Sequence, residues 1–143
     1  MILFSSDLEL KLENNIIMNK MIIDVTGEKI FLMVITNNDI YNITKDNTKI
    51  NYEKLTLIIN DFLNSLKLSI NDINQIYLNR GPGSFAGIRN SLSIVKAFNL
   101  TNKIEYYCYS FLDFKGETDV KYENIPDLCE KFKIEKNLIN PIY

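Results

Sequence analysis

The hydrophobic positions in the first part of the chain form short runs that are separated by turn residues. Residues 21–25 make an apolar run interrupted by one aspartate, as expected of a strand buried on both faces. Turns at 26–28 and 37–39 separate this run from a second run at 30–35 and from a shorter strand at 40–43. The pattern predicts three consecutive strands joined by tight turns, which is typical of an antiparallel meander.

The period of the pattern then changes from that of a strand to that of a helix. Six large side chains between residues 52 and 66 fall on one helical face: Tyr52, Leu55, Ile59, Phe62, Leu63 and Leu66. A strand at 75–78, a second helical stretch that ends near Leu100 and a strand at 104–109 follow. The element order βββαβαβ predicts an α/β fold with a mixed sheet, in which parallel strands are joined by helical crossovers.

A glycine-rich loop, residues 81–89, lies between the strand at 75–78 and the second helix and reads Gly-Pro-Gly-Ser-Phe-Ala-Gly-Ile-Arg. Glycine loses more conformational freedom on folding than any other residue, so such a loop indicates a sharp turn or a close approach of another group. The spacing fits neither a Walker A loop nor the G-x-G-x-x-G dinucleotide fingerprint, and Ser84 is not the centre of a G-x-S-x-G elbow.

The loop closely resembles the GPGSFTGLR signature of the TsaB family, and the resemblance continues through the helix at 90–98. Residues 21–26 resemble the opening strand of that family, and residues 140–143 resemble its Pro-x-Tyr segment near the C-terminus. The chain departs from the family pattern at Ala86, where the family has Thr, and at Val25, which replaces the Thr after the aspartate. The signature residues are Gly81, Pro82, Gly83, Ser84, Phe85, Gly87 and Arg89.

The resemblance implies a single ribonuclease-H-like lobe of the kind found in actin-like ATPases, spanning residues 18–114. Family members carry a second lobe of comparable size, of which residues 115–143 would be a short remnant. Residues 1–17 are expected to lie outside this fold, either as a disordered extension or because Met18 is the true start.

The resemblance also implies a function. TsaB is the non-catalytic partner of TsaD in the synthesis of threonylcarbamoyladenosine on tRNA, so the chain is expected to be a scaffold subunit and not an enzyme. Its implied partners are a TsaD-like transferase and, through that complex, a TsaE-like ATPase and tRNA, with no cofactor of its own. The alternative is a homodimeric protein-interaction module that has left this pathway.

The composition excludes several other classes of function. The chain has 46% hydrophobic and 24% charged residues and a net charge of −2, so no basic surplus favours tRNA binding by this chain alone. It contains no histidine, which excludes Ser-His-Asp and Cys-His catalysis, and its two cysteines cannot form a structural zinc site alone. Few cysteines and no apolar run of about 18 residues favour a cytoplasmic protein without a membrane span.

Two enzymatic interpretations of the fold are disfavoured. A two-metal nuclease needs several converging carboxylates, whereas the strand at 75–78 ends in Asn79-Arg80, and Glu53 and Asp61 fall on the polar face of their helix. A phosphotransferase would need a second lobe to close the nucleotide cleft. Asp24 and Thr26 are therefore interpreted as vestigial phosphate-site residues, or as the end of a strand in a turn. No metal site is expected.

The two helices are the expected partner-binding surface. In the second helix Phe85, Ile88, Leu92 and Val95 would cover the sheet, and the adjacent face would bind a partner helix. The predicted partner-binding residues are Gly87, Ser91, Ile94, Phe98, Leu57 and Ile58. The alternative is that this second face is also core. Arg80 and Arg89 flank the loop, either as solvated or loop-bonded charges or as groups that orient the partner.

Overall fold

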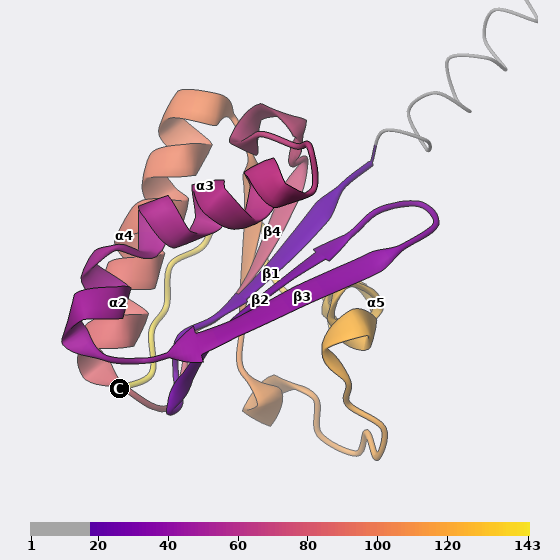
Figure 1. Cartoon of the computed structure of the whole chain (residues 1–143). Coiled ribbons are helices and arrows are strands. Elements are labelled where there is room, and N and C mark those ends of the chain that lie inside the picture. Colours follow the sequence, from indigo (N-terminus) through magenta and orange to yellow (C-terminus); the bar gives the residue numbers. More distant parts are fainter. Residues whose placement is uncertain (1–17) are drawn as a thin grey trace, which may run out of the picture.

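The computed structural model describes residues 18–143, and the prediction made for residues 1–17 lies outside this part of the chain. Within it, one sheet is formed by β1 (Lys20–Asp24), β2 (Lys29–Ile35), β3 (Ile40–Asp46), β4 (Gln75–Asn79) and β5 (Glu105–Tyr109). The helices are α2 (Lys49–Glu53), α3 (Leu55–Ser65), α4 (Phe85–Asn102) and α5 (Ile125–Lys131). Figure 1 shows α2, α3 and α4 on one face of the sheet and α5 on the other.

The strand order is β3-β2-β1-β4-β5. The pairs β1–β2 and β2–β3 are antiparallel, whereas β1–β4 and β4–β5 are parallel. This is the mixed sheet of a ribonuclease-H-like lobe, so the predicted fold class is confirmed. Because β4 and β5 are parallel to β1, the carboxyl ends of these three strands meet at one edge of the sheet, where the glycine-rich loop begins.

The main hydrophobic core lies between the sheet and the helices α3 and α4. Alternate residues of β1, including Met21 and Ile23, point into it, and Ile59 from α3 and Ile88 from α4 cover them. The helix predicted over 52–66 is divided at Lys54 into α2 and α3. Phe85, expected to cover the sheet with Ile88, Leu92 and Val95, is instead 56% exposed, because it begins α4 at the surface.

A second apolar cluster covers the opposite face of the sheet. It joins Ile22 and Tyr77 from the central strands to Ile125, Leu128 and Cys129 of α5. Pro126 lies in the first turn of α5, where its missing N–H group would have no partner within the helix. The part of the chain from Val120 to Ile134 therefore packs on the lobe as a covering layer for its second face.

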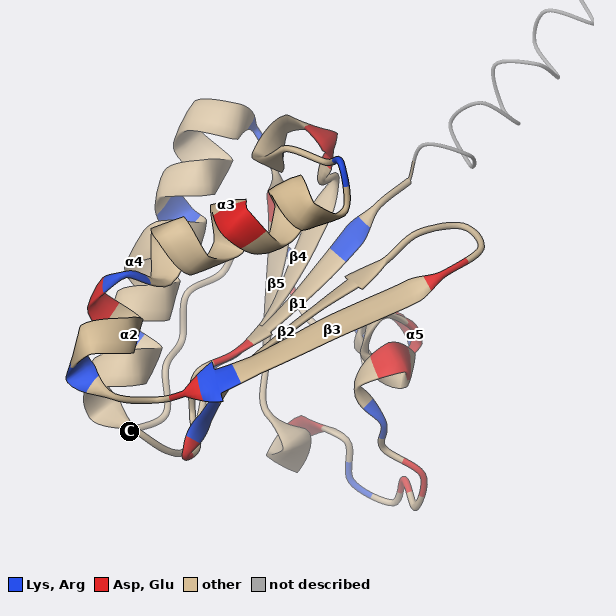
Figure 2. Ribbon diagram, in the orientation of Figure 1, with Lys and Arg blue, Asp and Glu red and all other residues tan. Residues whose placement is uncertain are grey.

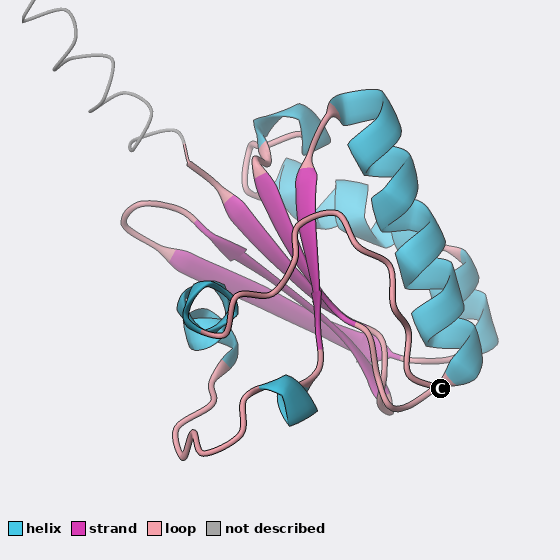
Figure 3. Ribbon diagram, turned by 180° about the vertical axis from the view of Figure 1, so that it is seen from behind, coloured by secondary structure: helices cyan, strands magenta, loops and turns pink. Residues whose placement is uncertain are grey.

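The last residues of the chain return to the helical side. Figure 3 shows this segment crossing the sheet near β5 and ending beside α4. Asn137 binds the main chain of Tyr106, and the Ile142 N–H donates to the Arg80 carbonyl at 2.8 Å. The C-terminus thus lies against the glycine-rich loop.

Candidate functional site

The buried carboxylate of Asp24 is the centre of a polar cluster at the carboxyl edge of the sheet. Its Oδ1 accepts hydrogen bonds from the Thr26 main-chain N–H at 3.0 Å and from the Thr26 hydroxyl at 2.7 Å. Its Oδ2 accepts from Asn79 Nδ2 at 2.9 Å and from the Tyr122 hydroxyl at 2.7 Å. The two residues predicted as a vestigial phosphate site, Asp24 and Thr26, are thus together, and each carboxylate oxygen has two partners within the chain.

Tyr122 completes this cluster from the face of the sheet that α5 covers. Its ring stacks on Phe31 with centroids 4.0 Å apart. Burial, and then the negative charge of Asp24, raise the pKa of Tyr122, so its hydroxyl stays protonated and donates. Tyr122 and Asp24 are 98 residues apart in the sequence, so no sequence pattern could have linked them.

Asn79 connects the cluster to the glycine-rich loop. While its amide nitrogen donates to Asp24, its Oδ1 accepts from the Gly81 main-chain N–H at 3.0 Å. From the sequence, Asn79 was used only as evidence against a nuclease, because it stands at the end of a strand where a nuclease would need an acidic residue. The signal that could have revealed its role is topological, because β4 is the parallel neighbour of β1 and the two strands end side by side.

The glycines of the loop allow three close backbone contacts. A Cβ atom on Gly83 would lie 2.3 Å from the Thr26 carbonyl oxygen, and one on Gly87 would lie 2.3 Å from the Val25 carbonyl oxygen. Gly81 has a φ of +112°, and a Cβ there would lie 1.9 Å from the Ile142 carbonyl oxygen. The loop is therefore pressed against the end of β1 and the C-terminal segment. The Ser84 hydroxyl caps α4 by accepting from the Gly87 N–H at 3.2 Å.

The two arginines that flank the loop differ in environment. Arg80 is largely buried and bonds Asp113 at 2.7 Å and the Asn140 carbonyl at 3.0 Å. It therefore ties the loop to the segments that follow β5. Arg89 is exposed on α4. Of the two, only Arg89 lies where a partner could reach it readily.

The predicted partner face of α4 is mostly core. Gly87, Ser91 and Phe98 are buried within the chain, and Ile94 is half-buried against the core cluster. The prediction that these residues form an outward surface was wrong for the first three. The sheet and α2–α3 approach α4 from two sides, so the core covers a wider arc of the helix than a single stripe.

The outward surface of the helical layer is formed by other residues. Leu57 of α3 is 56% exposed, as expected, whereas Ile58 is half-buried against the core. Ile50 of α2 and Leu100 of α4 are 67% and 70% exposed. This set of Ile50, Leu57 and Leu100, called the outer helical surface below, was not predicted except for Leu57.

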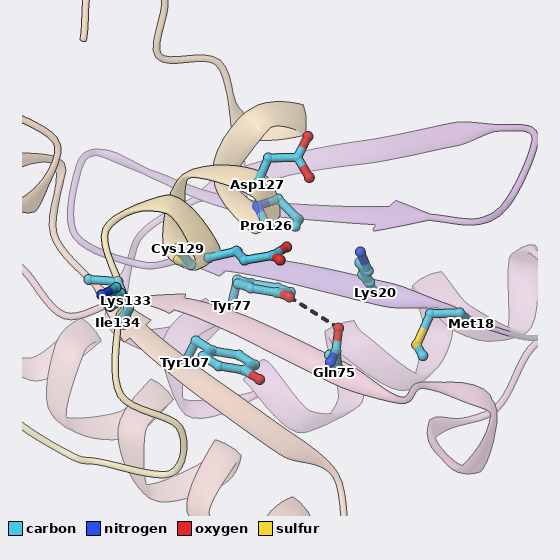
Figure 4. A pocket seen from close by; sticks show the side chains of 11 residues that line it. Met18, Lys20, Gln75, Tyr77, Tyr107, Pro126, Asp127, Cys129, Lys133 and Ile134 are labelled. Carbon is cyan, nitrogen blue, oxygen red and sulfur yellow. Dashed lines mark hydrogen bonds between the residues drawn. The ribbon is translucent and has the colours of Figure 1, made fainter. Parts of the chain in front are cut away.

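A hollow of about 540 Å³ lies on the other face of the sheet (Figure 4). Tyr77 and Tyr107 stack in it with centroids 5.1 Å apart, and the Tyr77 hydroxyl donates to Gln75 Oε1 at 3.1 Å. Burial raises the pKa of the Cys129 thiol in its wall to about 12, so the thiol is protonated and inert at neutral pH. The hollow includes Lys20 and Gln75, the first residues of their strands, and is thus remote from the carboxyl edge where α/β sheets usually bind ligands.

Two further properties concern residues 18–143 only. No group of three or more His, Cys, Asp and Glu side chains in this part of the chain is arranged to hold a metal ion. No helix in the same range is long and apolar enough to cross a membrane.

The chain is similar to known proteins in sequence and in structure. The family model for TsaD, tRNA N6-adenosine threonylcarbamoyltransferase, matches residues 48–129. A tRNA threonylcarbamoyladenosine biosynthesis protein TsaB from Buchnera aphidicola subsp. Schizaphis graminum is 28% identical over 95 residues, which cover 66% of this chain and 45% of that protein. TsaB from Buchnera aphidicola subsp. Baizongia pistaciae is 32% identical over 69 residues, covering 48% of this chain and 31% of that protein.

Among solved structures, YeaZ from Pseudomonas aeruginosa superposes with a TM-score of 0.61 at 16% identity. The superposition covers 68% of this chain and 46% of YeaZ. At this identity the likeness concerns the fold. The matched region spans less than half the length of the curated relatives.

Proposed function

This chain belongs to the family that the TsaD model describes, and it resembles the proteins named TsaB and YeaZ. From that premise we propose that it is a TsaB-like scaffold subunit. It binds a TsaD-like transferase and supports threonylcarbamoyl transfer to tRNA adenosine without catalysing it. The observation that carries the proposal is the match to proteins named for this pathway.

The partner binds the outer helical surface. Ile50, Leu57 and Leu100 expose apolar area there, and Ala86, Ser93 and Ala97 of α4 are small residues at or near the surface. Large apolar side chains next to small ones allow a partner helix to pack closely. This surface replaces the buried Gly87–Ser91–Phe98 face as the proposed site.

Catalysis belongs to the partners. Both oxygens of the Asp24 carboxylate are occupied by donors from the same chain, which favours a structural role for this residue. Nucleotide, metal and most tRNA contacts are assigned to the TsaD-like subunit and, through the complex, to a TsaE-like ATPase.

The test is co-purification with the TsaD-like transferase of the same organism. Leu57→Asp should abolish co-purification, because the carboxylate would have to be desolvated in the interface. The matched control is Leu112→Asp, since Leu112 is similarly exposed at 59% but follows β5 in a different part of the fold. Both variants should remain folded by circular dichroism.

Two results would contradict the proposal: wild-type protein that does not bind the transferase, or Leu57→Asp and Leu112→Asp variants that bind alike. Wild-type protein that binds only itself would instead favour the alternative function, a homodimeric interaction module.

A further inference from the structure

One long stretch of the chain contains no acidic residue. Residues 73–104 include neither aspartate nor glutamate, although the whole chain has 18 acidic residues and a net charge of −2. The basic residues of this stretch are Arg80, Arg89, Lys96 and Lys103. The stretch forms β4, the glycine-rich loop and α4, and Figure 2 shows basic but no acidic residues on α4 itself. One helix of the chain is thus locally basic, which the net charge conceals.

Three of these four basic side chains are exposed. Arg80 is largely buried in its ion pair, whereas Arg89, Lys96 and Lys103 are accessible to solvent. Within residues 18–143, none of these three forms an ion pair. Arg89 and Lys96 are seven residues apart, close to two helical turns, so they share one face of α4 about 10.5 Å apart along its axis. Their charges are therefore available to a ligand.

A hollow of about 190 Å³, called the basic hollow below, lies between α4 and the C-terminal segment. Arg89 and Lys96 line it from α4, and Ile139, Pro141 and Tyr143 line it from the segment that Figure 3 shows ending beside this helix. The C-terminal residues 137–143 contain no acidic side chain either. The lining thus carries two positive charges and no acidic side chain, which favours an anion.

Two exposed aromatic rings lie beside the basic hollow. Phe85 begins α4 one turn before Arg89, and its ring centroid is 4.6 Å from that of Tyr143. Phe85 is 56% exposed and Tyr143 is 57% exposed, so both rings are accessible. Exposed aromatic rings next to basic side chains are typical of surfaces that bind single-stranded nucleic acid, because bases stack on the rings while the cations contact the backbone.

We propose that the basic hollow binds a phosphodiester group of RNA between Arg89 and Lys96. A neighbouring unpaired base stacks on Phe85 and Tyr143, and Lys103 contacts a phosphate further along the strand. The arginine fork donates two parallel hydrogen bonds to phosphate oxygens, whereas the lysine ammonium acts as a point charge. The choice of RNA among polyanions rests on the function proposed above, in which the chain acts on tRNA through its complex.

The basic hollow is separate from the surface assigned to the transferase. None of Ile50, Leu57 and Leu100, which define the outer helical surface, lines the hollow. Three cations are too few for tight RNA binding by this chain alone, so the contact adds to those made by the transferase. Because the two surfaces share no defining residue, substitutions can remove one and leave the other.

Fluorescence anisotropy with a labelled tRNA transcript tests the basic hollow in the full chain. The wild type should bind at low salt, and log K should fall with log[salt] with a slope of about −2 to −3 for three phosphate contacts. Arg89→Gln combined with Lys96→Gln should lower the affinity about tenfold or more and reduce the slope by about 1.5. The matched control, Lys115→Gln with Lys133→Gln, removes the same charge at exposed positions outside the hollow and should bind within about twofold of the wild type.

Tyr143→Leu tests the stacking contact. Leucine keeps an apolar contact with Phe85 but has no aromatic face, so the affinity for a single-stranded RNA oligonucleotide should fall about fivefold or more. Tyr143→Phe keeps the ring and should bind as the wild type does. Neither substitution should change binding to a fully paired RNA duplex, because only unpaired bases are free to stack on a side chain.

Co-purification with the TsaD-like transferase separates this proposal from the proposed function. The variant with Arg89→Gln and Lys96→Gln should still co-purify with the transferase. Leu57→Asp should lose the transferase and bind the tRNA transcript as the wild type does. A wild-type chain that binds the transcript through the basic hollow but does not bind the transferase would support this inference and contradict the scaffold function.

Four results overturn the inference. The first is a wild-type chain that does not bind the transcript at low salt, and the second is equal affinity and salt slope for the hollow variant and its charge-matched control. The third is a hollow variant that loses the transferase and keeps RNA binding, which would make the hollow a protein contact. The fourth is release of the transcript by inorganic phosphate but not by sodium chloride of equal ionic strength, which would identify a site for free phosphate.

Discussion

The carboxyl edge of the central strands and the β3 side of the sheet are opposite kinds of surface. At the carboxyl edge the family-like residues are occupied: Asp24 has four donors, Asn79 bridges to Gly81, and the glycines lie against backbone. On the β3 side, main-chain groups and apolar side chains such as Ile40 and Tyr41 are exposed.

The comparison shows that the residues that carry a recognisable family motif need not be the residues that remain exposed to a partner. The signature loop is specific because it must fit between β1, α4 and the C-terminal segment, which permits few residue types. The exposed edge of β3 is under no such steric constraint, and no motif marks it in the sequence. Family resemblance thus points first to the structural centre of this lobe, and the free surfaces have to be found from the structure.

The largest effect is expected where α4 is buried. Phe98→Asp should lower the free energy of unfolding by about 4 kcal/mol or more, since it removes a core aromatic ring and buries a carboxylate. Leu100→Asp, two residues further on the exposed side, should change it by less than about 0.5 kcal/mol. Urea denaturation measures both. A Phe98→Asp variant as stable as the wild type would show that this face is not core.

A smaller effect is expected from the close contacts of the signature loop. Gly83→Ala should destabilise the protein by about 1–3 kcal/mol, because the new methyl group meets the Thr26 backbone. Gly27→Ala, with no atom within 4 Å of the new Cβ, should be neutral or stabilise by about 0.4–1 kcal/mol. Thermal unfolding compares the pair. Equal midpoints for the two variants would contradict the close-approach explanation of the loop.

Loss of one hydrogen bond to Asp24 should have the smallest effect of the three. Tyr122→Phe removes a donor to a buried carboxylate, and we expect a loss of about 1.5 kcal/mol. Tyr143→Phe is the control, since its hydroxyl lies on an exposed residue. Denaturant titration should separate the two variants. If Tyr122→Phe matches the control, the polar cluster does not depend on Tyr122.

The elements of the fold were largely predictable from local pattern. The strands and α4 follow from their apolar periodicity, and the residue types of Ser110, an N-cap, and Pro126, in the first turn of α5, are common at helix starts. The division at Lys54 between α2 and α3 could not be predicted from local pattern, because the apolar stripe continues across Lys54. Of the candidate site, Asp24 and Thr26 were found together, but Tyr122 was not found.

The sequence by itself determined the class of fold, the position of the signature loop and the family, because periodicity and motif are local properties of the chain. The tertiary structure decided which residues remain free. Phe98 is buried and Leu57 exposed although both are apolar helix residues, since neighbouring elements cover one and not the other. Exposure depends on contacts between segments far apart in sequence, and for this reason the accessible surfaces could be assigned only after the chain was folded.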